Sequence, residues 1–92
     1  MKTPKLTRAD AEEIAVGALK FLAEEPERIG RFLALSGMTP ADLRQAADTT
    51  AFLQAVLSHM LGDESLLLVF ASQARLPPER VALAEQLLAT YP

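Results

Sequence analysis

The stretch TTAFLQAVLSHMLGDESLLLVFASQAR, residues 49 to 75, decides the fold class of this 92-residue chain. In its first half the apolar residues recur at intervals of three and four, which is typical of one buried face of an α-helix. Gly62 stops that helix, and Asp63 can cap the first turn of another. The stretch therefore predicts two helices, one that is capped by Asp48 or Thr49 and runs to Leu61, and one from Glu64 to about Ala74.

The second of these helices carries an apolar run, Leu66 to Phe70, that covers every side of the cylinder. A helix without a polar face lies in the centre of a core or is covered by a partner. We therefore expect this helix to be central or to be hidden by another protein.

Four more helices are predicted from caps and prolines outside this stretch. Thr7 can cap a first helix, and Pro26 cannot continue it but suits the first turn of the next. These helices run from Arg8 to Ala23, from Pro26 to Ser36, from Pro40 to about Ala47, and from Pro77-Pro78-Glu79 onward, with Tyr91 against the end of the last. No segment shows sustained alternation, and the connections are short. The sequence thus predicts an all-α fold, a compact bundle or array of about six short helices.

The spacing of apolar residues also predicts which side of each helix is buried. The expected buried residues are Ala11, Ile14, Ala15, Ala18, Leu22, Ile29, Phe32, Leu33, Leu35, Leu43, Ala46, Phe52, Leu53, Val56, Leu57, Met60, Leu61, Val81, Ala84, Leu87 and Leu88. Gly17 lies inside the first helix, where glycine costs about 1 kcal/mol relative to alanine. We interpret it as a point of close helix packing, with approach of a ligand as the alternative.

The composition limits the function classes. The chain has no cysteine, nine Lys plus Arg and twelve Asp plus Glu, for a net charge of -3. Disulfides, thiolate metal sites and cysteine nucleophiles are excluded, and nucleic acid is not an expected partner. The charged start does not match a secretory signal, and the apolar run from Leu66 to Ala71 is shorter than the roughly 20 residues of a membrane helix. We expect a single cytoplasmic domain over residues 1–92, with residues 1–6 as a disordered tail.

A helix-turn-helix is the first specific alternative, over residues 32–46 around Gly37. The corner departs from DNA-binding examples at Leu33, where a small residue is usual, and at Ser36, where an apolar one is usual. In the second helix Asp42 offsets the positive charge that phosphates require. DNA binding therefore stays the runner-up hypothesis, with Arg31 and Arg44 as its residues, supported by Lys2, Lys5 and Arg8.

A small enzyme or metal protein is the third reading. His59, the only histidine, precedes Asp63 by four residues, with Glu64 next to it. One histidine with carboxylates is a poor zinc site, and helix capping explains Asp63 and Glu64 without a metal. No serine lies in a nucleophile-elbow sequence, and no glycine-rich phosphate loop is present. We therefore expect no enzymatic activity, no metal and no cofactor.

Apolar surface is the remaining feature, because six short helices in so small a chain do not necessarily cover all their apolar residues. We hypothesise a noncatalytic protein-interaction module, regulatory in role, that contacts an unidentified protein through a helix face or groove. Its expected anchors, near the corners, are Leu35, Met38 and Leu76. Internal packing of all apolar residues is the alternative, and the chain is expected to be a monomer or a homodimer.

The segments RFLALSGMTPADLR (31–44), FLQAVL (52–57), DESLL (63–67) and PPE (77–79) are together similar to a family of short alphaproteobacterial proteins, domain of unknown function 3572. The similarity covers about residues 11–88. It implies a compact helical domain in a bacterial cytosol and no particular activity. Genes of the family often lie beside that of a response regulator, so the resemblance also implies a signalling protein as a candidate partner.

Overall fold

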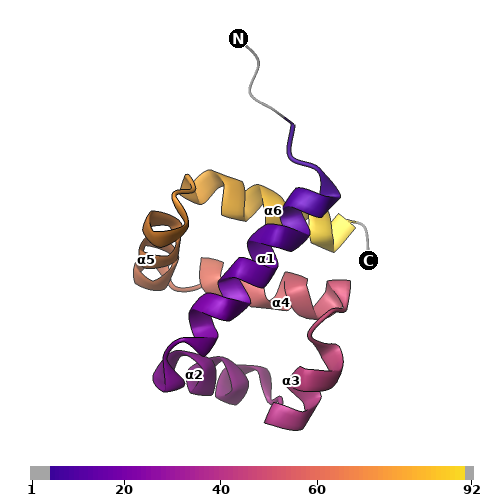
Figure 1. Cartoon of the computed structure of the whole chain (residues 1–92), viewed down its shortest axis with the longest axis vertical. Helices are drawn as coiled ribbons and strands as arrows, with labels where there is room; N and C mark the ends of the chain where they lie inside the picture. The colour runs from indigo at the N-terminus through magenta and orange to yellow at the C-terminus, as the bar shows by residue number, and fades with distance from the viewer. Residues whose placement is uncertain (1–4, 91–92) are drawn as a thin grey trace.

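The structure, a computed structural model, describes residues 5–90, and this range contains six α-helices and no strand (Figure 1). The helices are α1 (Arg8–Ala23), α2 (Pro26–Ser36), α3 (Pro40–Ala46), α4 (Thr50–Leu61), α5 (Glu64–Ala74) and α6 (Pro78–Thr90). The predicted all-α class is confirmed, and the predicted helix ends agree to within about a residue. Tyr91 lies outside the described residues.

Two reciprocal caps explain why α1 and α3 begin where they do. The Thr7 hydroxyl accepts a hydrogen bond from the Asp10 N–H at 3.0 Å, and the Asp10 carboxylate accepts one from the Thr7 N–H at 3.0 Å. Thr39 and Asp42 repeat the arrangement at 3.1 and 3.0 Å. Each pair satisfies two backbone donors that the first turn of a helix leaves free.

The core lies where α1, α4 and α6 pack against one another, and Figure 1 shows α1 crossing in front of the other two. Small residues on the inner side of α1, Ala11, Ala15 and Ala18, are fully buried and allow this close approach. The core residues are Leu6, Ala11, Ile14, Ala15, Ala18, Phe21, Leu22, Phe32, Phe52, Leu53, Val56, Leu57, Met60, Phe70, Val81, Ala84 and Leu88. No buried polar or charged side chain occurs in residues 5–90.

The short helices α2, α3 and α5 lie around this core (Figure 1). On α2 only Phe32 is buried, and its ring meets that of Phe52 edge-on, with 5.8 Å between centroids. Arg28 also fixes α2 to α1, because its guanidinium carbon lies 3.9 Å from the centroid of the Phe21 ring. Helix α3 has no buried residue, although Leu43 packs against the core from outside.

Helix α5 differs from the expectation of a central helix. It buries only Phe70 and Ala71, while Leu68 is 50 % exposed and Val69 is 46 % exposed. Phe70 packs on Phe21 of α1, with 5.5 Å between ring centroids, and this contact orients α5. Of the two alternatives expected for this helix, the central position is therefore wrong, because α5 packs on one side only, and cover by a partner stays a prediction.

Three further expectations need correction. Leu35, placed in the buried stripe of α2, is 68 % exposed because it falls beyond the side of the helix that Phe32 anchors. Leu6, placed in a disordered tail, is buried in the core; residues 1–4 of that tail lie outside the described residues. A Cβ at Gly17 would meet no atom within 4 Å, so no close packing inside this chain explains the glycine.

Candidate functional site

Exposed apolar side chains are the main surface feature of residues 5–90. Five large ones are at least one third exposed: Val16, Leu35, Leu68, Val69 and Leu83. Leu68 and Val69 are the only neighbours among them. The sequence showed that the run containing this pair is apolar on every side of the helix, but it did not show which side is exposed. It missed Val16 and Leu83, since single apolar residues outside a stripe carry no signal of their own.

Capping interactions fix where α5, the helix that carries this pair, begins and ends. At its start the Asp63 carboxylate accepts a hydrogen bond from the Leu66 N–H at 3.2 Å. At its end Arg75 adopts a left-handed conformation, with φ 57°, and the Leu76 N–H returns to the Ala71 carbonyl at 2.9 Å. Both ends are thus fixed by local hydrogen bonds. Figure 1 shows α5 at the edge of the molecule, so its outer side meets no other helix.

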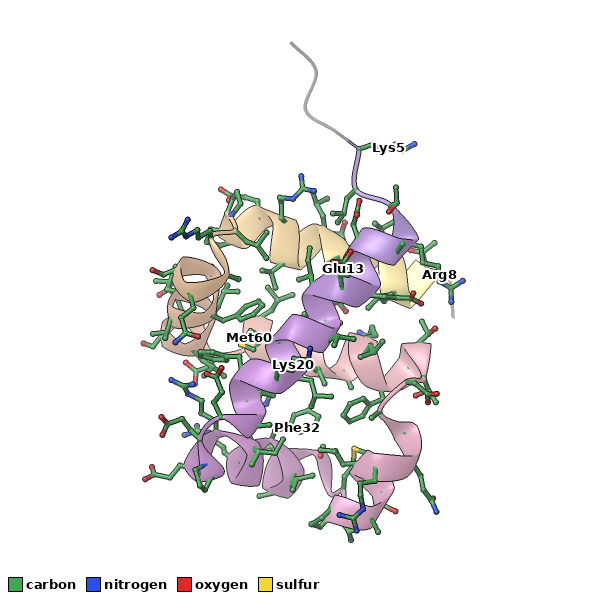
Figure 2. The ribbon with its side chains drawn as sticks, viewed as in Figure 1. Lys5, Arg8, Glu13, Lys20, Phe32 and Met60 are labelled. Carbon is green, nitrogen blue, oxygen red and sulfur yellow. The ribbon has the colours of Figure 1, made fainter. Side chains whose placement is uncertain are left out.

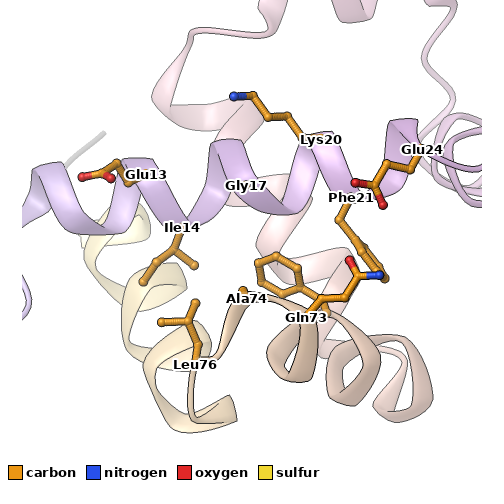
Figure 3. Close-up of a pocket in the computed structure, with 10 residues that line it drawn as sticks. Glu13, Ile14, Gly17, Lys20, Phe21, Glu24, Gln73, Ala74 and Leu76 are labelled. Carbon is orange, nitrogen blue, oxygen red and sulfur yellow. The ribbon is translucent and has the colours of Figure 1, made fainter.

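A hollow of about 320 Å³ lies between α1, α5 and the connection that follows α5 (Figure 3). Ile14, Phe21, Phe70 and Leu76 supply its apolar lining, and Gly17 contributes bare helix backbone. The charged residues along it are Glu13, Lys20 and Glu24. The hollow therefore combines an apolar floor with a charged edge.

The three predicted anchors are not brought together. Leu35 is open to solvent and borders a hollow of about 240 Å³ between α2 and α4. Met38 is half-buried and packs against the core, and Leu76 is half-buried in the hollow beside α1. Of the three, only Leu35 has most of its side chain exposed to solvent.

His59 lies at the edge of α4, beside Leu35, where its ring packs edge-on against Phe32 with 5.1 Å between ring centroids. Partial burial lowers the pKa of this imidazole, and the positive charge of Arg31 acts in the same direction against the opposing effect of Asp63. Within the described range no three His, Asp or Glu side chains gather as metal ligands. The Asp63 carboxylate is engaged as the cap of α5.

The comparison with protein families gives a match over most of the chain. The family model for "Protein of unknown function (DUF3572)" matches residues 8–90. The chain belongs to this family. The resemblance predicted from the sequence is thereby confirmed at the level of the family. No curated protein and no solved structure matches the chain.

In this DUF3572 chain the residues proposed for DNA contact are spread over several elements. Arg31 and Arg44 are exposed on α2 and α3, and Lys2 lies outside the described range. Arg8 on α1 pairs with Glu12 at 3.6 Å. The hydrogen bonds from Thr39 lower the pKa of Asp42, so a negative charge persists in the first turn of α3, where phosphates would be repelled.

In residues 5–90 no individual helix of this DUF3572 chain has both the length and the apolar character that crossing a bilayer requires. Helices α4 and α5 meet these criteria only when taken together, and the chain bends by 111° between them.

Proposed function

We propose that this DUF3572 chain is a noncatalytic protein-interaction module that binds a protein partner through the outer side of α5. The observation that carries the proposal is the adjacent pair Leu68 and Val69, about half exposed on a helix whose opposite side is anchored in the core. Fully burying such a side chain contributes about 1.5–3 kcal/mol, so covering the remaining exposed part of each is worth about 1 kcal/mol. A partner gains this energy without any rearrangement of the fold.

The surroundings of the pair match the usual layout of a protein interface, in which polar residues surround an apolar centre. Ser65, Ser72 and Gln73 are exposed on the same helix. These three are uncharged, and Glu64, exposed one turn before Leu68, adds a charged group that would lie at the rim of the interface. The proposed partner is a protein of the bacterial cytoplasm with its own apolar groove or helix face, and a signalling protein is the leading candidate.

The test compares capture of proteins from the native cytosol by the unmodified chain, by Leu68→Glu and by Leu35→Glu. Leu35, an exposed leucine on a different helix, is also one of the anchors predicted from the sequence, so Leu35→Glu distinguishes the two candidate contacts. All three chains should melt at closely similar temperatures. We expect one protein to be captured by the unmodified chain and by Leu35→Glu but to be lost with Leu68→Glu, and the purified pair to reproduce this order in calorimetry.

Two results would contradict the proposal. Retention of the captured protein by Leu68→Glu would show that α5 is not the contact. Selective loss with Leu35→Glu would move the contact to the hollow between α2 and α4.

A further inference from the structure

We propose that the outer side of α1 binds a second copy of this chain, forming a symmetric antiparallel homodimer with Gly17 where the two helices cross. This surface is separate from Leu68 and Val69, so the inference does not depend on the proposed function. Glu13, Val16 and Lys20 are all exposed on α1. Figure 2 shows Glu13 and Lys20 on the side of α1 that no other helix covers.

Gly17 provides the first argument. Glycine in a helix interior is unfavourable by up to about 1 kcal/mol relative to alanine. Its place here has no cause inside the chain, since a Cβ would meet nothing within 4 Å. A glycine does allow another backbone or side chain to approach the helix closely. Next to it Val16, 37 % exposed, offers an apolar side chain that can fill such a gap on a second copy.

Charge complementarity provides the second argument and fixes the register. If Val16 of one copy lies opposite Gly17 of the other in an antiparallel pair, Glu13 lies opposite Lys20. The two-fold axis repeats each contact, giving two Val16 to Gly17 contacts and two Glu13 to Lys20 ion pairs. Glu13 and Lys20 are seven residues apart, about two helical turns, and therefore lie on one side of α1.

The same charges exclude the parallel arrangement, which would place Glu13 against Glu13 and Lys20 against Lys20. Neither Glu13 nor Lys20 forms an ion pair with another described residue. Within residues 5–90 the ion pair present is that between Arg8 and Glu12. Both charges are thus free for an intermolecular contact. The surface is complementary to itself, which is what a two-fold interface requires and why a second copy is the occupant we infer.

The decisive experiment is sedimentation equilibrium of purified Glu13→Lys and Lys20→Glu chains, alone and mixed in equal amounts. Each variant alone replaces two attractive contacts with two repulsive ones, so its dissociation constant should rise about tenfold or more. The mixture restores attraction at both positions and should form a heterodimer. The double variant, Glu13→Lys with Lys20→Glu, should dimerise like the unmodified chain.

Matched controls distinguish an effect of the proposed helix register on dimer formation from an effect of net charge or of misfolding. Glu27→Lys on α2 and Arg44→Glu on α3 change the net charge equally at exposed positions and should leave the dissociation constant unchanged. Gly17→Leu should weaken the dimer by blocking the crossing, whereas Gly30→Leu, also in open space, should not. Thermal melting verifies that each chain is folded.

Several outcomes would overturn the inference. The unmodified chain could remain monomeric at every concentration, or the two single variants could fail to associate on mixing. If the Glu27→Lys and Arg44→Glu controls weakened the dimer equally, net charge alone would explain the effect. Loss of dimerisation in Leu68→Glu alone would place the contact on α5 instead.

Discussion

Truncating Phe32 to alanine should destabilise the whole fold, because this is the one buried residue of α2. The side chain is 1 % exposed and packs edge-on against both Phe52 and His59. Phe→Ala changes in cores cost about 3–5 kcal/mol. At about 0.05–0.15 kcal/mol per residue, a chain of this size has a total stability of about 5–14 kcal/mol. The substitution therefore removes a large part of the free energy of unfolding.

The assay is thermal unfolding followed by circular dichroism, with urea titration as a second measure. In a domain of this size 1 kcal/mol corresponds to about 4–8 °C, so Phe32→Ala should lower Tm by about 12 °C or more. Leu35→Ala is the control, since Leu35 lies on the same helix but is 68 % exposed, and its effect should stay within about 0.5 kcal/mol. Similar Tm values for the two variants would refute the reasoning that Phe32 anchors α2.

Three other measurements test local features. Gly37 and Arg75 both adopt positive φ at helix ends, 75° and 57°. Gly37→Ala should therefore lower the free energy of unfolding by about 1 kcal/mol, and Arg75→Gly should raise it by a similar amount. If urea titrations showed that both substitutions change the free energy of unfolding in the same direction, this reasoning would be contradicted. The Thr7 N–H lowers the pKa of Asp10, so the stabilisation from this carboxylate is present above about pH 4 and is lost as pH falls further; Asp10→Asn should therefore differ from the unmodified chain less at pH 3 than at pH 6. Burial lowers the pKa of His59, so as pH drops the unfolded chain binds this proton before the folded chain does. The free energy of unfolding should therefore fall as pH drops below about 6.5. If the free energy of unfolding of His59→Gln fell equally steeply with pH, other groups would be responsible.

The helix boundaries were predictable because their causes lie within a few residues of each end. Thr7, Thr39 and Asp63 each cap the helix that follows through a backbone N–H three residues away. Gly37 ends α2 in the left-handed conformation that glycine favours. Such signals act over a few residues, so they can be recognised in the sequence without knowledge of the fold.

The exposed side of α5 was not predictable, because its cause lies in a distant part of the sequence. The run from Leu66 to Phe70 is apolar on every side, and periodicity cannot choose among equivalent sides. The choice is made by Phe70 meeting Phe21 on α1, which also remained outside the predicted stripe of that helix. Leu6 was misassigned although a local signal exists, because an apolar residue directly before a helix cap often packs against the start of that helix.

Small residues on α1 occur on two sides, and only one of them is explained by the fold. On the inner side, alanines without exposure lie against α4 and α6, and larger side chains there would separate the helices of the core. On the outer side Gly17 is equally free of bulk, yet nothing of its own chain fills the space. If solubility alone had shaped this side, a charged or long polar residue would serve better than glycine and would also favour the helix. The small residues on the inner side are covered by helices of the same chain, and the glycine on the outer side is not. This difference is why we expect the outer side of α1 to contact another copy.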